Sequence, residues 1–207
     1  MLTPGSIVPM RLVRVPEPFD RDDFIFELKY DGFRAVAHIA QGTCQLVSRN
    51  RNVFKRFGKL ASEIARAVQI DCVLDGEIVA LDSDGRPQFY DLMRRRGDLC
   101  FYAFDVLAVG DEDLRDRPLI ERKARLRRIV PNRESRVLYV SHFERTGVDL
   151  FRVVCEQDLE GTVAKWKYGA YLDGAAEQTS WFKVKNSTYS QAEGRRELFQ
   201  KRLAPAG

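Results

Sequence analysis

The sequence predicts an α+β domain built on antiparallel β-sheets that are flanked by helices. Two observations support this fold class. Apolar stretches of strand length follow one another in pairs joined by short turns, such as Asp31-Gly32 and Gln41-Gly42, and tight turns connect antiparallel strands, whereas parallel strands need long crossovers. The helical patterns also do not alternate regularly with single strands, as they would in a doubly wound parallel sheet.

Strands are expected where apolar residues alternate or run continuously between Gly, Asp or Asn residues. These ranges are 24–30, 33–39, 44–47, 73–81, 100–109 and 137–140, with shorter strands at 161–165 and 181–185. Apolar residues at helical spacing predict helices around 60–68, 119–129 and 148–155, and a weaker helix at 192–203.

The composition indicates a globular protein in a reducing compartment. With 44% apolar and 31% charged residues, the chain has too many hydrophobic residues for intrinsic disorder. Its four cysteines form no C-x-x-C pair, which indicates buried thiols, and two histidines do not favour a zinc site. The first ten residues lack the charged and long apolar segments of a signal peptide, so we expect a cytoplasmic protein with no membrane partner.

The sequence shows neither internal repeats nor a long linker, so we expect one domain over residues 1–186. Residues 187–207 become polar and then basic, and form a C-terminal tail or helix in this interpretation. The tail either packs Leu198, Phe199 and Leu203 on the core or serves as a nucleic-acid arm; its amphipathic pattern favours packing.

Lys29 stands at the end of an apolar strand and directly before a turn. A lysine at its ordinary pKa of about 10.4 is neutral in only about 1 of 2,500 molecules at pH 7. A nucleophilic lysine therefore needs desolvation, a nearby cation or a divalent metal. Taken alone, a lysine before a turn is usually just solvated, so the chemistry depends on partners elsewhere in the chain.

Such partners occur in three other segments. Glu77 lies inside an apolar strand, where an unpaired charge is costly. Glu160 precedes a short strand that ends near Lys165, and Lys183 and Lys185 share one strand face because they are two residues apart. Each segment alone could be an ordinary amphipathic edge strand. Together they could neutralise a triphosphate, bind a divalent metal and supply an amine.

The segments Lys29-Tyr30-Asp31-Gly32-Phe33-Arg34, 75–80, 160–165 and 181–185 resemble the motifs of the nucleotidyltransferase domain of ATP-dependent DNA ligases. RNA ligases and messenger-RNA capping enzymes belong to the same superfamily. The resemblance extends from about residue 8 to residue 186. It implies an ATP-grasp-like nucleotidyltransferase fold, ATP and Mg²⁺ (or Mn²⁺) as cofactors, and nicked double-stranded DNA as substrate.

The resemblance also implies residue roles. Lys29 would be the adenylated nucleophile, with Glu27 and Leu28 beside it at the ATP, and Arg34 would contact the ribose or the nick end. Arg49, in Ser48-Arg49-Asn50, would bind DNA phosphate. At the position of Arg51 the family commonly has glycine.

Further roles follow from the later motifs. Glu77 would act at the ribose or the metal, Glu160 at the metal, and Lys165 as the last lysine of the ATP site. Lys183 and Lys185 would bind the α-phosphate. Phe104 would stack on adenine; without the resemblance, it would serve equally well as a core residue in a buried strand.

Two basic runs, at 94–96 and 122–128, are expected to be helix faces or helix C-termini, and DNA contact is the alternative. DNA ligases of this type continue into an OB-fold domain, for which residues 187–207 are too short. Whether the chain is an excised domain or a natural core is left open, and a separate OB-fold or DNA-repair protein could be a partner. We expect self-adenylation first, with nick sealing as the complete activity. An RNA ligase, a capping-type transferase or a module that only binds nucleotide or nicks is the alternative.

Overall fold

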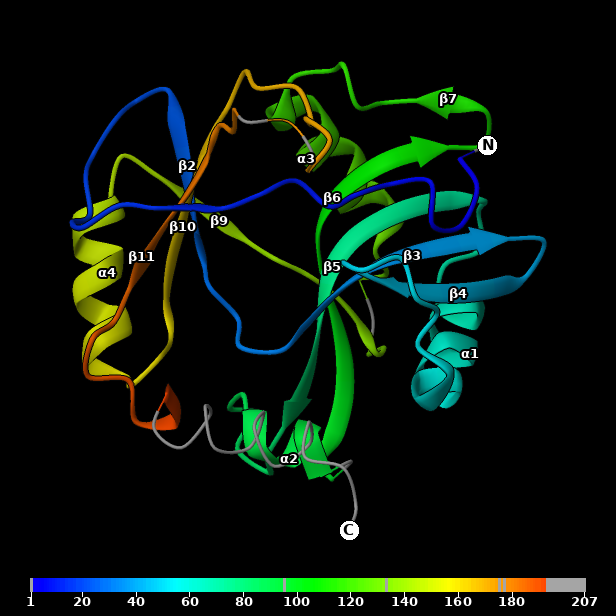
Figure 1. Ribbon diagram of the computed structural model, residues 1–207, viewed down its shortest axis with the longest axis horizontal. Coiled ribbons are helices and arrows are strands. Elements are labelled where there is room, and N and C mark those ends of the chain that lie inside the picture. The colour runs from blue at the N-terminus through cyan, green and yellow to red at the C-terminus, as the bar shows by residue number, and fades with distance from the viewer. Residues whose placement is uncertain (1, 95, 133, 175, 177, 193–207) are drawn as a thin grey trace, which may run out of the picture.

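The computed structural model describes residues 2–94, 96–132, 134–174, 176 and 178–192. Within these ranges, two β-sheets lie beside each other and helices pack around them (Figure 1). The predicted α+β class with antiparallel sheets is confirmed.

The first sheet has five strands in the order β1-β11-β10-β2-β9. Their bounds are Val13–Arg14, Trp181–Lys185, Gly161–Trp166, Phe24–Leu28 and His142–Glu144. All neighbours are antiparallel except β1 and β11, which are parallel. The strand that leads into Lys29 therefore lies inside this sheet, next to the strand that carries Lys165.

The second sheet has the order β4-β3-β5-β6-β7, and β8 pairs with β6. The bounds are Thr43–Ser48, Phe33–Ala40, Cys72–Leu81, Asp98–Val109, Glu112–Asp113 and Val137–Tyr139. Only β6 and β8 are parallel. The register of β5 and β6 shifts next to Asp75, between that residue and Gly76, and such irregularities bend and twist strands.

Helices pack against both sheets. Their bounds are Gly58–Ala67 (α1), Phe89–Arg94 (α2), Leu119–Ile129 (α3) and Gly147–Glu156 (α4), with short 3₁₀ helices at Lys55–Phe57 (η1) and Ser190–Ala192 (η2). Helix α4 packs on β2 and β10, whereas α1 and α3 pack on the second sheet. Figure 1 shows α4 at the left and α1 at the right.

Side-chain alternation directs the two faces of β2 to different surroundings. Phe24 and Phe26 pack in the cluster under α4. Ile25 points the other way, into a cluster shared with residues of the second sheet. Because successive side chains of a strand point to opposite faces, Glu27 and Lys29 follow Ile25. The charged end of the strand therefore faces the second sheet.

The predicted strands, and the predicted helices that fall within the described residues, are present with ends that differ by at most two residues. The elements that were not predicted are short: β1 and β7 have two residues each, β9 has three and α2 has six. Such lengths carry little periodic pattern. The predicted helix at 192–203 lies outside the described residues from 193 onward.

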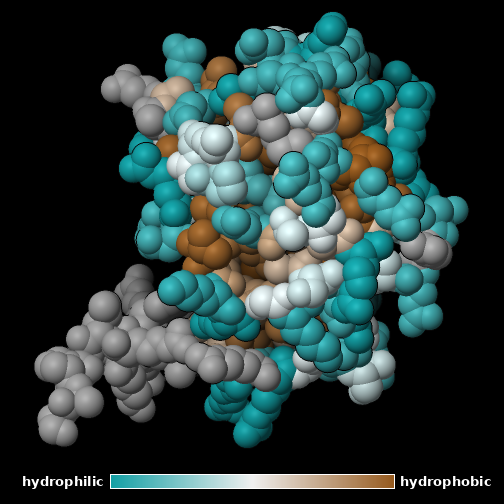
Figure 2. All heavy atoms as spheres, turned by 90° about the vertical axis from the view of Figure 1, so that its right-hand side faces the viewer, coloured by the Kyte–Doolittle hydropathy of each residue, from teal (hydrophilic) through white to brown (hydrophobic). Residues whose placement is uncertain are grey.

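The surface offers no membrane-crossing element among the described residues, since none of their helices is long and apolar enough. Figure 2 shows the side of the molecule that carries α1, where hydrophilic side chains surround smaller hydrophobic areas. The described cysteines are free thiols; Cys72 and Cys100 are buried, as the sequence predicted for all four, whereas Cys44 and Cys155 are only half-buried.

Candidate active site

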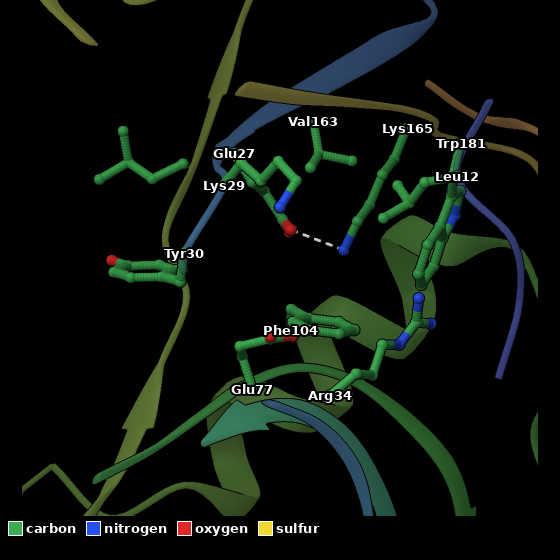
Figure 3. A pocket seen from close by; sticks show the side chains of 11 residues that line it. Leu12, Glu27, Lys29, Tyr30, Arg34, Glu77, Phe104, Val163, Lys165 and Trp181 are labelled. Carbon is green, nitrogen blue, oxygen red and sulfur yellow. Dashed lines mark ion pairs between the residues drawn. The ribbon is translucent and has the colours of Figure 1, made fainter. Parts of the chain in front are cut away.

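A pocket of about 410 Å³ lies between the two sheets, and its walls come from both. The first sheet and the residues directly after β2 contribute Glu27, Leu28, Lys29, Tyr30, Val163, Lys165 and Trp181. The second sheet contributes Arg34, Glu77 and Phe104, and Leu12 completes the lining. Figure 3 shows the Lys165 side chain reaching from β10 toward Phe104, with Glu27 beside it. Seven of the nine predicted ATP-binding residues thus share one pocket.

The end of β2 and the start of β10 hold Lys29 in place. Its backbone N–H donates to the carbonyl of Gly161 over 2.9 Å. Its Nζ lies 2.6 Å from Oε2 of Glu160, and its side chain is 18% exposed. Gly161 has φ +152°, and a Cβ there would lie 2.1 Å from the carbonyl oxygen of Val184. Only glycine allows the approach that places Glu160 beside Lys29.

The remaining two predicted ATP ligands lie on β11, next to Lys29 but outside the lining of the pocket. The Lys185 Nζ is 3.5 Å from Oε1 of Glu160. Burial lowers the pKa of Lys183, and the positive charges of Lys29 and Lys185 lower it further. Three amines therefore gather around one carboxylate. Such a cluster is suited to a polyanion such as a triphosphate.

Glu77 enters the pocket from β5. Burial raises the pKa of its carboxyl to about 8, and the nearby Glu160 and Asp75 add to the rise, while Lys29 and Arg34 oppose it. A further cation beside Glu77, in addition to Lys29 and Arg34, would hold this carboxylate in its charged form. Among the described residues, no three His, Cys, Asp or Glu side chains are grouped to hold a metal ion. Mg²⁺ typically uses one or two carboxylates plus phosphate oxygens, so Glu77 and Glu160 fit an ion that arrives with a triphosphate.

The other carboxylate of the pocket, Glu27, is held by two buried lysines. Oε1 accepts a 2.7 Å hydrogen bond from Lys123, and Oε2 lies 2.6 Å from the Nζ of Lys165. Although burial acts to raise the pKa of Glu27, the two positive charges outweigh it and hold the pKa below its ordinary value. The carboxylate is therefore ionised in the interior.

Arg34 lines the pocket with its guanidinium fixed. It donates two hydrogen bonds to the buried Asp75, at 3.0 and 2.6 Å, and one of 2.8 Å to the carbonyl of Met10. Tyr171 donates to the same Asp75 over 2.6 Å. A bidentate arginine–carboxylate pair is geometrically specific. These hydrogen bonds therefore fix the Arg34 side chain in one position, where it forms the wall of the pocket opposite β10.

Phe104 is half-buried rather than enclosed in the core. Its ring packs edge-on against Trp181, with centroids 5.9 Å apart. The Nζ of Lys165 lies 4.3 Å from the Phe104 centroid and 4.1 Å from that of Trp181. A flat heterocycle could stack on the Phe104 ring beside Trp181 in place of the Lys165 amine.

The predicted DNA contact Arg49 is exposed and follows β4, outside the pocket. Its charge still acts on Lys183, lowering the pKa of that amine. Arg51 has φ +63°, a left-handed conformation that favours glycine. Arg51 therefore adopts the backbone conformation that a glycine would have in this turn. The Arg51 N–H donates to the carbonyl of Ser48 over 2.8 Å.

Sequence reasoning missed several residues of the site. Tyr30 and Trp181 lie within the recognised motif segments but received no role there, and their aromatic bulk was the available signal. Leu12 carried no signal. The basic run at 122–128 was expected on a helix face, and Arg125, Arg127 and Arg128 are indeed exposed. Arg122 and Lys123 are instead buried to 1% exposure and paired with Asp105 and Glu27, because they lie on the side of α3 that packs on the sheets.

A second, larger pocket of about 800 Å³ lies on the other side of Lys29 and Tyr30. Glu160 and Tyr102 line it, with Arg86 on its rim. Tyr189 closes one wall and donates a 3.0 Å hydrogen bond to Asp31. Lys29 and Tyr30 thus border two spaces, of which only the first is walled by Phe104 and Trp181.

Two mainly antiparallel sheets with a pocket between them, and a lysine between carboxylates at its rim, are the arrangement of a nucleotidyltransferase domain of the DNA ligase type. The likeness to known proteins agrees. Mycobacterial DNA ligase D, solved in complex with ATP and MES, superimposes with a TM-score of 0.75 at 25% identity, over 89% of this chain and 62% of that chain.

Residues 11–185 match the family described as ATP dependent DNA ligase domain, and the chain belongs to this family. It is 33% identical to the multifunctional non-homologous end joining protein LigD of Pseudomonas aeruginosa, over 88% of this chain and 22% of that protein. It is 35% identical to a probable DNA ligase of Streptomyces coelicolor, over 77% of this chain and 34% of that protein. The chain thus spans about a fifth and about a third of the lengths of these two relatives.

Proposed function

We propose that this chain is the adenylation core of an ATP-dependent DNA ligase. The neutral amine of Lys29 attacks the α-phosphate of ATP, a nitrogen–phosphorus bond forms, and pyrophosphate leaves as the amine loses its proton. The AMP then passes to the 5′-phosphate at a nick in double-stranded DNA, and attack by the 3′-hydroxyl seals the strand and releases AMP. We further expect this activity in the cytoplasm.

The observation that carries the proposal is the position of Lys29. It stands where the pocket with Phe104 and Trp181 meets the three-amine cluster around Glu160. A base in the pocket and phosphates at the amines would bring the α-phosphate to the Lys29 Nζ. Holding the two reactants together in this way supplies a large part of the rate.

The other predicted residues receive roles that fit their places. Lys183 and Lys185 would stabilise charge on the transferring phosphate, and Glu77 with Glu160 would hold Mg²⁺ or Mn²⁺. Glu27, Leu28, Arg34, Phe104 and Lys165 would hold the nucleoside. Arg49, and the exposed edge of Arg34, would contact the DNA.

A further domain is expected to take part in sealing. The matched region covers only 34% and 22% of the lengths of the two curated relatives, which are therefore about three and about four and a half times as long as it. We propose that an OB-fold domain or a DNA-repair protein closes DNA against this core. Phosphate contacts made here would be insensitive to sequence, as nick sealing requires.

The test follows the label of radioactive ATP. Label on the α-phosphate should remain on the protein after denaturation, whereas label on the γ-phosphate should leave as pyrophosphate. A chase with nicked DNA should then move the label to the 5′-end of the nick. Nucleotide binding without protein labelling would favour a module that only binds, and transfer to nicked RNA alone would favour an RNA ligase.

A further inference from the structure

Glu27 has two lysine partners that differ in their surroundings. Lys123 comes from α3, is 1% exposed, and does not line the pocket. Lys165 comes from β10 and does line it. The two amines approach different oxygens of the carboxylate, at 2.7 and 2.6 Å. One partner therefore lies behind Glu27 and the other lies in the space that a ligand would enter.

Lys123, the partner behind Glu27, makes several polar contacts. The Lys123 Nζ donates to Oε1 of Glu27 and, over 2.7 Å, to the carbonyl of Val140. It also lies 4.4 Å from the centroid of the Tyr139 ring, within cation–π range. Because Lys123 does not line the pocket, we expect these contacts to stay in place when a nucleotide enters.

Lys165, the partner on the pocket side of Glu27, makes fewer contacts than Lys123. The Nζ of Lys165 forms a 2.6 Å ion pair with Oε2 of Glu27, but unlike Lys123 it donates to no backbone carbonyl among the described residues. It sits 4.3 Å from the Phe104 centroid and 4.1 Å from the Trp181 centroid, in the space where a stacked base would lie. Figure 3 shows the amine between Glu27 and these two rings.

We propose that Lys123 is a positioning residue that acts as the permanent counter-ion of Glu27, so that Lys165 can leave the carboxylate and turn to the nucleotide when ATP enters. The proposal rests on the proposed function. It explains why one buried carboxylate has two buried lysines: a buried charge that loses its partner is costly, and with Lys123 in place Glu27 keeps a partner in both states.

The inference predicts a specific coupling. Without Lys123, Glu27 depends on Lys165 alone, and ATP must compete with a buried ion pair. Lys123→Met should therefore weaken ATP binding at least tenfold. It should raise KM for adduct formation and leave kcat within threefold, because Lys29 and its neighbours are untouched. In the Glu27→Gln background the carboxylate charge is gone, so adding Lys123→Met should change ATP affinity less than threefold.

Binding is measured by titration calorimetry with α,β-methylene ATP, whose α-phosphate cannot be transferred. Arg125→Met, an exposed change on the same helix, is the control and should bind like the wild type. If Lys123→Met does not fold, Lys123→Gln replaces it, because its amide can still donate to Glu27 and Val140.

Equal losses from Lys123→Met in both backgrounds, or wild-type affinity in the single variant, would overturn the proposal and leave Lys123 with a purely structural role. Wild-type protein that binds the analogue but forms no adduct with ATP would refute the proposed reaction and leave the coupling measurable. Absence of binding by the wild type would overturn both.

Discussion

The Nζ of Lys29 lies 2.6 Å from Oε2 of Glu160, so the proposed nucleophile contacts a carboxylate that is proposed to bind the metal ion. Only the unprotonated amine of a lysine is a nucleophile, and an ammonium is not. Glu160 can pair with either that ammonium or a divalent cation. Exchange of one for the other would release the amine at the moment when ATP and metal are both present.

Replacing Glu160 should therefore change how the reaction responds to metal. We expect Glu160→Gln to slow adduct formation at least about tenfold and to move the midpoint of a Mg²⁺ titration to higher concentration. Initial rates of protein labelling at several Mg²⁺ concentrations measure both. The control is Glu156→Gln, which removes an exposed carboxylate paired with Arg152. An unchanged metal titration in the Glu160 variant would remove this residue from the metal site.

The sequence predicted this pair of residues but not their contact. Both belong to recognised motifs, yet they are 131 positions apart, and only the antiparallel pairing of β2 with β10 brings them together. The fold class was predictable because alternation and turns are local signals. The Lys123–Glu27 pair was not, since a run of arginine and lysine in a helix reads as a solvated face, and tertiary packing alone decides which members turn inward.

Phe104 offers a test of base stacking against core packing. Removing the ring in Phe104→Ala should weaken ATP binding about five- to tenfold, because an aromatic stacking contact contributes on the order of 1 kcal/mol. The ring is half-buried, so the melting temperature should change little. Calorimetric titration and thermal unfolding measure the two effects. A large loss of stability with normal ATP affinity would instead make Phe104 a core residue.

Arg49 separates DNA binding from nucleotide chemistry. We expect Arg49→Ala to weaken binding of nicked duplex DNA and to reduce the dependence of log K on log salt by about one unit, as loss of one phosphate contact does. Adduct formation should stay near the wild-type rate. Arg128→Ala, on the exposed side of α3, serves as a matched loss of charge. Equal effects of the two variants on DNA would mean only a general charge effect.

His142 should make the free protein sensitive to acid. Burial lowers the pKa of its imidazole below the ordinary value of about 6.5, and Lys123 and Lys165 lower it further against Glu27 and Glu144. The unfolded chain therefore takes up this proton at higher pH than the folded chain, and the contribution of His142 to stability is lost as pH falls below about 6.5.

Thermal unfolding between pH 7.5 and 5, measured with and without His142→Gln, tests this point. The melting temperature of His142→Gln should fall less between pH 7.5 and 5 than that of the wild type. The buried His38, whose pKa is also lowered by burial, acts in the same direction, whereas the raised pKa of Glu77 opposes the decline in both proteins. Identical slopes for the two proteins would show that His142 contributes nothing to the acid sensitivity.

The central claim is that Lys29 carries the nucleotide. Intact-mass spectrometry of the purified protein, before and after incubation with ATP and Mg²⁺ and again after pyrophosphate, tests it directly. The account predicts a gain of one AMP that pyrophosphate reverses, that persists in the exposed-lysine control Lys59→Ala, and that is absent from Lys29→Ala. An adduct that survives in Lys29→Ala, or no adduct in the wild type under any condition, would contradict it.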